Sequence, residues 1–167
     1  MQADSPFVLM MVGVPGSGKS TWIRNYVTLF PDTVVASTDR IIEKYAFENG
    51  TTYNAVFNTL IKDAEKMMNE DIDRAIQEQK NIIWDQTNLT VKTRFRKLSR
   101  FPYHYHRYAM FMETPPSNEH KYFLNSAERA GKDIPEHILE SMIDSVQPPT
   151  LEEGFDRVYT YSISNGE

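Results

Sequence analysis

The first candidate for chemistry is a glycine-rich stretch near the amino terminus that ends in lysine and serine. It reads Gly13-Val-Pro-Gly-Ser-Gly18-Lys19-Ser20. Glycines let successive backbone N–H groups approach phosphate oxygens, and a helix that starts there adds the positive end of its dipole. Lys19 is expected to reach the β and γ phosphates, and the Ser20 hydroxyl to hold Mg²⁺, which predicts a nucleoside triphosphate site. The residues expected to contact the nucleotide here are Gly13, Pro15, Gly16, Ser17, Gly18, Lys19, Ser20 and Thr21.

Two aspartates follow apolar segments of strand length further along the chain. Asp39 comes two residues after the segment 33–37. A carboxylate beside the γ phosphate can take the proton of an acceptor hydroxyl, so Asp39 is a candidate general base. An ordinary carboxylate at the start of a helix is favoured by the helix dipole, and spacing alone does not choose between these two roles.

The second aspartate, Asp85, ends the apolar segment 81–85. P-loop proteins carry an aspartate at such a strand end to hold the metal, so Asp85 is expected near Mg²⁺ and near the acceptor. Capping of the following turn is the alternative role. The residues expected to contact the acceptor are Asp39, Arg40, Asp85, Thr87, Asn88 and Arg94.

Alternating strand and helix patterns indicate how these residues are positioned. The expected strands are residues 7–12, 33–37, 81–85, 106–112 and 156–163, and the expected helices are residues 21–29, 38–45, 51–79, 91–100, 117–130 and 135–146. This order predicts an α/β fold, a three-layer sandwich with a parallel five-stranded sheet. The carboxyl ends of parallel strands share one edge, so the strand at 33–37 should end beside the glycine-rich loop.

Length and composition limit the class of protein. The 167 residues, 40% of them hydrophobic, fit one domain over residues 1–167. There is no cysteine, no apolar run of membrane-spanning length and no signal-peptide pattern at the start, so we expect a cytoplasmic protein with no membrane partner. The net charge of −5 argues against a protein that coats duplex phosphates over a broad face.

A basic segment follows Asp85 and carries no acidic residue. Its basic residues are Lys92, Arg94, Arg96, Lys97, Arg100 and Arg107, and the aromatic residues and imidazoles among them are Phe101, Tyr103, His104, Tyr105 and His106, with Tyr108 just beyond. Such a combination can bind polynucleotide phosphates and stack on bases. A solvated helix face followed by a half-buried strand accounts for the same pattern.

Several of these motifs together resemble the P-loop polynucleotide 5′-hydroxyl kinase family. This family includes the phage end-healing kinases and the kinase domain of polynucleotide kinase-phosphatases, within a broader group of small P-loop kinases. The resemblance spans nearly the whole chain. It is carried by Gly13-Val-Pro-Gly-Ser-Gly-Lys-Ser-Thr-Trp22, Ser37-Thr-Asp39, Trp84-Asp85-Gln-Thr-Asn88, Asn125-Ser-Ala-Glu-Arg129-Ala-Gly-Lys132-Asp-Ile-Pro135 and Pro149-Thr-Leu-Glu-Glu-Gly-Phe155.

The resemblance implies roles for individual residues. Asp39 matches the general base, and Asp85 the aspartate that organises the acceptor site. Arg129 matches a lid arginine that reaches the donor phosphates, although a helix-end arginine that complements the dipole is the plainer reading. The lid is expected over residues 118–135, with Arg129 and Lys132 binding the nucleotide.

The implied activity is ATP- and Mg²⁺-dependent transfer of the γ phosphate to a hydroxyl on nucleic acid. The first expected acceptor is the 5′-OH of DNA, as a single strand or at an end. Phage members carry an acceptor-gripping arginine three residues after the base, where this chain has Ile42. A 5-hydroxymethyluracil base within DNA, or a small molecule such as a nucleoside, therefore stays open as the acceptor. A P-loop ATPase or other nucleotide-binding module is the competing class, although such proteins more often poise a glutamine or glutamate for water.

Overall fold

A central sheet of five parallel strands forms the core of the protein. The computed structural model describes residues 5–114 and 132–162. The strands are β1 (Phe7–Val12), β2 (Thr33–Ala36), β3 (Asn81–Trp84), β4 (His106–Met112) and β5 (Arg157–Tyr161), in the order β2-β3-β1-β4-β5. All four neighbouring pairs are parallel, so the predicted sheet type is confirmed and β5 lies at the margin, as expected.

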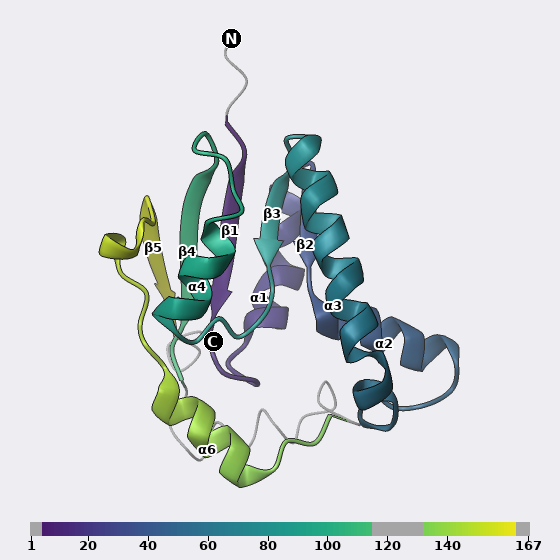
Figure 1. Cartoon of the computed structure of the whole chain (residues 1–167). Coiled ribbons are helices and arrows are strands. Elements are labelled where there is room, and N and C mark those ends of the chain that lie inside the picture. Colours follow the sequence, from purple (N-terminus) through teal and green to yellow (C-terminus); the bar gives the residue numbers. More distant parts are fainter. Residues whose placement is uncertain (1–4, 115–131, 163–167) are drawn as a thin grey trace.

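Helices cover both faces of the sheet, and α6 lies beyond the carboxyl ends of the strands, as Figure 1 shows. The helices are α1 (Lys19–Tyr26), α2 (Thr38–Glu48), α3 (Tyr53–Gln77), α4 (Val91–Leu98) and α6 (Glu136–Ser145), with short 3-10 turns η1 (Val27–Leu29) and η3 (Leu151–Glu153). Alternate β1 side chains enter two separate cores: Met10 packs with residues of α3 and α4, and Met11 packs with Ile23 of α1. The three-layer arrangement follows from this alternation.

The position of β2 corrects one expectation from the sequence. The segment that precedes Asp39 was expected to end next to the glycine-rich loop, but β3 lies between β1 and β2. Asp85 therefore follows the strand adjacent to β1, while Asp39 follows a strand one position further away. The long return through α2 and α3 lets the chain place β3 between β2 and β1.

Side-chain caps fix where several helices begin. The Ser37 hydroxyl accepts a hydrogen bond from the backbone N–H of Arg40 at 3.3 Å, and Thr52 accepts one from Ala55 at 3.2 Å. These caps satisfy N–H groups that have no partner within the helix. The predicted starts of α2 and α3 are thereby confirmed, and α6 begins after Pro135 as expected.

The helix predicted at residues 117–130, which includes Arg129, lies outside the described residues. Within residues 5–114 and 132–162, no helix is long and apolar enough to cross a membrane.

Candidate active site

The glycine-rich loop joins β1 to α1 at the carboxyl edge of the sheet. Gly16 and Gly18 adopt positive φ angles of 80° and 99°, which only glycine adopts without strain. Gly18 is also the N-cap of α1, where no side chain caps the first turn. The Lys19 ammonium donates to the carbonyls of Gly13 and Val14 at 2.7 and 3.0 Å, which holds it over the loop.

Two loop residues lie beneath this surface. A Cβ on Gly13 would come within 2.6 Å of the Ser17 hydroxyl oxygen and 2.9 Å of the Met112 Cβ, so the site requires glycine. Ser17 is 1% exposed, and its hydroxyl oxygen has no hydrogen-bond partner among the described residues. Neither residue lines the cavity described next, and both shape the loop from below; their contact with the nucleotide stays a prediction.

A single cavity of about 1000 Å³ brings most of the expected site residues together. Its lining includes the loop residues Pro15, Gly16, Gly18, Lys19, Ser20 and Thr21, the strand-end residues Asp39, Asp85 and Thr87, and the linker residue Lys132. Residues Ile138 and Met142 of α6 close the side opposite the strand ends, where Figure 1 draws this helix. The cavity is large enough for a nucleotide together with part of an acceptor.

Asp39 lies exposed at the start of α2 and is held by a neighbour that the sequence did not reveal. The Tyr53 hydroxyl donates a hydrogen bond to Asp39 Oδ1 at 2.6 Å. The Lys132 ammonium lies 5.1 Å from the centroid of the Tyr53 ring and forms an ion pair with Glu43. Burial lowers the pKa of Lys132, while the negative charge of Asp39 opposes this change. Tyr53 directly follows the predicted cap Thr52, but no local pattern connects it with Asp39.

Asp85 lies deeper than Asp39, and its surroundings favour a cation. Burial is the main cause that raises its pKa, and the negative charge of Asp39 adds to it. The positive charges of Lys19 and Arg40 act in the opposite direction. A carboxylate removed from water and facing another carboxylate is stabilised by a bound cation.

The donor set fits Mg²⁺ rather than an all-protein metal cage. Among the described residues, no three histidine, cysteine, aspartate or glutamate side chains gather into a metal-binding group. Mg²⁺ usually keeps several waters and takes few protein ligands beside substrate phosphates. The Ser20 hydroxyl and the Asp85 carboxylate, which line the same cavity, would be enough.

Most of the sequence matches one known protein family. The sequence model of the AAA domain family, AAA_33, matches residues 8–149. This chain belongs to the AAA domain family. The matched range runs from β1 through the phosphate-binding loop, Asp39 and Asp85 to the segment after α6.

Solved structures share the fold of this AAA domain at low sequence identity. A chain of the Pnkp1/Rnl/Hen1 RNA repair complex matches with a TM-score of 0.69 and 21% identity, over 93% of this chain and 48% of that chain. The AAA domain thus spans about half of that relative's length. A chain of the PezAT toxin-antitoxin system of Streptococcus pneumoniae matches with a TM-score of 0.72 and 18% identity, over 98% of this chain and 70% of that chain. A fungal RNA kinase matches with a TM-score of 0.57 and 14% identity, over 99% of this chain and 78% of that chain. These likenesses identify a P-loop kinase-like fold.

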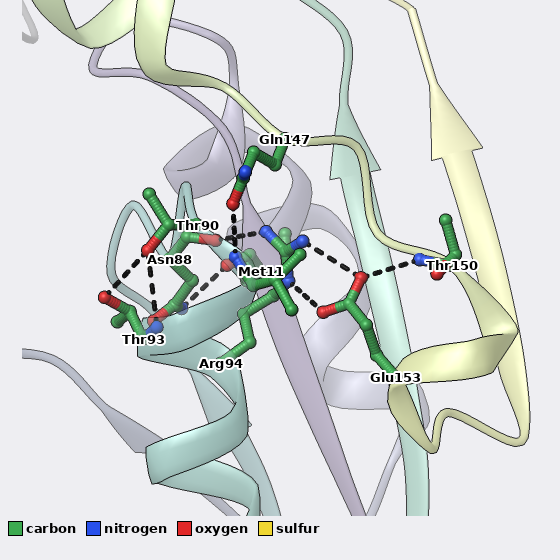
Figure 2. A network of polar contacts seen from close by, with 9 residues as sticks. Met11, Asn88, Thr90, Thr93, Arg94, Gln147, Thr150 and Glu153 are labelled. Carbon is green, nitrogen blue, oxygen red and sulfur yellow. Dashed lines mark hydrogen bonds and ion pairs between the residues drawn. The ribbon is translucent and has the colours of Figure 1, made fainter.

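Two residues expected to contact the acceptor instead support the AAA domain from inside. Arg94 is fully buried, and its guanidinium donates to both carboxylate oxygens of Glu153, at 2.7 and 3.0 Å, and to the carbonyl of Asn88 at 2.8 Å. The Asn88 side chain is also buried, and its amide donates to the backbone carbonyl of Met11 at 2.8 Å (Figure 2). Both groups hold the loop after β3 against β1 and η3. Full burial and pairing contradict the acceptor assignment of Arg94, whereas Asn88 also lines a second cavity and its acceptor contact stays a prediction.

This network predicts a large loss of stability when Glu153 is removed. Glu153→Ala leaves the buried Arg94 charge without its carboxylate, which we expect to lower the free energy of unfolding by about 3–5 kcal/mol. Urea unfolding followed by circular dichroism measures the change. Glu152→Ala, at an exposed neighbouring position, is the matched control and should stay within about 0.5 kcal/mol of the original chain. Equal stability of the two variants would contradict the structural role of the pair.

The aromatic residues of the basic segment lie away from the cavity. Tyr105 and Phe101 are buried, and His106 opens β4 at the amino end of the strands, opposite the edge that carries Asp39 and Asp85. Base stacking near the active site by this group is therefore not supported. Arg40 is exposed and outside the cavity lining, and its acceptor contact stays a prediction.

Proposed function

We propose that this AAA domain is an ATP-dependent kinase that transfers the γ phosphate to the 5′-hydroxyl end of a polynucleotide. The observation that supports kinase chemistry is the shared cavity. Lys19 and Ser20 line this cavity together with Asp39 and Asp85, so groups suited to hold a phosphate donor and a candidate base for the acceptor share one space. Phosphoryl transfer requires mainly such positioning together with charge stabilisation.

Different side chains of the cavity are proposed to have different roles in the reaction. The Lys19 ammonium binds donor phosphate oxygens and stabilises the charge on the transferred group. Asp39 Oδ1 accepts a hydrogen bond from Tyr53, which leaves Oδ2 to take the proton of the acceptor hydroxyl. As that proton leaves, the hydroxyl oxygen bonds to the γ phosphorus, and the bond between the γ phosphorus and the β–γ bridging oxygen breaks. Mg²⁺ held by Ser20 and Asp85 would neutralise charge on the donor phosphates. Arg129 and Lys132 are proposed as further phosphate contacts.

A nucleic acid acceptor is supported by two independent likenesses. The sequence motifs resemble polynucleotide 5′-hydroxyl kinases, and the structural relatives include an RNA repair complex and an RNA kinase. Ile42, at the position of the arginine in phage members, is fully buried, so that helix position offers no grip on an acceptor phosphate here. DNA and RNA both remain acceptors to be tested.

Transfer from γ-labelled ATP to a panel of acceptors tests this proposal. We expect label on 5′-OH DNA or RNA oligonucleotides and little on water, free nucleosides or an oligonucleotide carrying internal 5-hydroxymethyluracil and a blocked 5′ end. The matched control is the same oligonucleotide with a 5′ phosphate, which offers no 5′-hydroxyl. A preference for transfer to a free nucleoside would contradict polynucleotide recognition. A preference for the oligonucleotide with internal 5-hydroxymethyluracil would mean that the acceptor hydroxyl belongs to a base within the strand. Release of the γ phosphate to water alone would indicate an ATPase.

A further inference from the structure

A second cavity of about 780 Å³ lies beside the active site, over β3 between α3 and α4. Figure 1 shows these two helices on the same face of the sheet, on either side of that strand. Gln86 and Thr87 line both cavities, so the second one begins where the acceptor side of the first one ends. Its basic lining residues are Arg96, Lys97 and Arg100. We call this second cavity the α3–α4 groove.

The basic residues of this region differ in how their charges are compensated. Arg94 is paired with Glu153, Arg100 with Asp73, and the guanidinium of Arg107 donates to two backbone carbonyls. These three charges already have partners within the fold. They are therefore poor candidates for binding an external anion.

Among the basic residues that line the groove, Lys97 and Arg96 are the ones without a carboxylate partner in the described part of the chain. The Lys97 ammonium donates to the side-chain oxygens of Gln86, at 2.7 Å, and Asn88, which are both neutral, and no carboxylate of the described residues lies within ion-pair distance. Arg96 is exposed, and its guanidinium has no partner in the described part of the chain. A half-buried ammonium held only by neutral oxygens is costly to keep charged, and a bound anion offsets that cost.

We propose that the α3–α4 groove binds the phosphodiester backbone of a single-stranded acceptor, with Arg96 and Lys97 as phosphate contacts. This inference rests on the proposed function, because the strand would enter the groove with its 5′ end at Asp39 and Asp85. The strand passes Gln86 and Thr87, and the next phosphates lie against Lys97 and Arg96. The Trp84 ring lies 4.9 Å from the Lys97 ammonium and is buried, so it contributes to holding the lysine rather than to stacking on bases.

Direct binding of fluorescent single-stranded oligonucleotides, measured by anisotropy without ATP, tests the groove. Arg96→Ala is expected to weaken binding on the order of tenfold and to reduce the slope of log Kd against log salt by about 0.7, since one phosphate contact is lost. The arms with DNA and with RNA determine which backbone fits. Lys44→Ala removes the same charge from an exposed position on α2 outside both cavities, and should leave affinity unchanged. Equal affinities of Arg96→Ala and Lys44→Ala would overturn the proposal.

Lys97 offers a second readout that a merely structural role would not produce. Burial lowers the pKa of Lys97 to about 7, aided by Arg96 and opposed by Glu65 of α3, while Arg100 lies in the same groove. A phosphate favours the protonated lysine, so affinity is expected to fall as the pH rises through about 7. Lys97→Arg keeps the charge at all these pH values and should lose this decline while still binding. An unchanged pH profile in Lys97→Arg would count against a phosphate contact.

Kinetics separate failure of the groove from failure of the kinase proposal. Arg96→Ala should raise the KM of a long 5′-OH oligonucleotide on the order of tenfold, and leave that of a nucleoside 3′-phosphate, which is too short to reach the groove, unchanged. Transfer to oligonucleotides without dependence on Arg96 would reject the groove and keep the kinase. Arg96-dependent binding without transfer to any acceptor would reject the kinase and keep the groove.

Discussion

Replacement of Asp39 by asparagine is expected to lower kcat for phosphate transfer by about 10²- to 10⁴-fold. Asparagine keeps the size of the side chain and an oxygen that can accept the hydrogen bond from Tyr53. It cannot take a proton from the acceptor hydroxyl. Turnover measured with γ-labelled ATP should therefore fall, while the Kd for ATP should stay within a few-fold of the original value.

An exposed carboxylate elsewhere in the chain provides the control for this experiment. Asp63→Asn removes an exposed carboxylate of α3 outside the cavity lining and should leave turnover unchanged. Near-normal turnover in Asp39→Asn would make Asp39 an ordinary carboxylate at a helix start. Asp85, which also follows a strand end and lines the cavity, would then become the leading candidate for the base.

The fold was predictable because its signals are local. Buried strands alternate with amphipathic helices, and caps such as Ser37, Thr52 and Thr90 mark helix starts within a few residues of the chain. The neighbours of each strand depend instead on long-range pairing. Nothing near residues 33–37 indicates that β3, more than forty residues later, will separate β2 from β1.

The site was predictable only where its chemistry follows a sequence motif. Lys19, Ser20, Asp39 and Asp85 meet in one cavity, because a parallel sheet gathers its strand ends at one edge. Arg94 could not be assigned from its neighbours, since its partner Glu153 lies 59 residues away and only the folded chain buries the pair. Tyr53 likewise reaches Asp39 from a different helix. A basic residue in the sequence reports charge, but not whether that charge is already compensated.

Loss of the Lys19 ammonium should affect both ATP binding and transfer. Lys19→Ala removes the cation that we propose binds the donor phosphates, so we expect kcat/KM to fall on the order of 10³-fold and ATP affinity to weaken. The same ammonium lowers the pKa of Asp85, and its removal should leave that carboxylate more readily protonated and a poorer partner for Mg²⁺. Isothermal titration with ATP and Mg²⁺ measures binding, and γ-label transfer measures turnover.

Lys19 also supports the loop, so a folding control is needed to interpret this variant. Its ammonium donates to the carbonyls of Gly13 and Val14, and alanine leaves both without that partner. Lys19→Met keeps most of the apolar stem but also removes the ammonium with both of these hydrogen bonds, and urea unfolding of both variants separates loss of stability from loss of phosphate binding. If Lys19→Met unfolds at the original urea concentration and still binds ATP with the original affinity, the phosphates do not depend on this lysine. The donor would then have to lie elsewhere in the cavity.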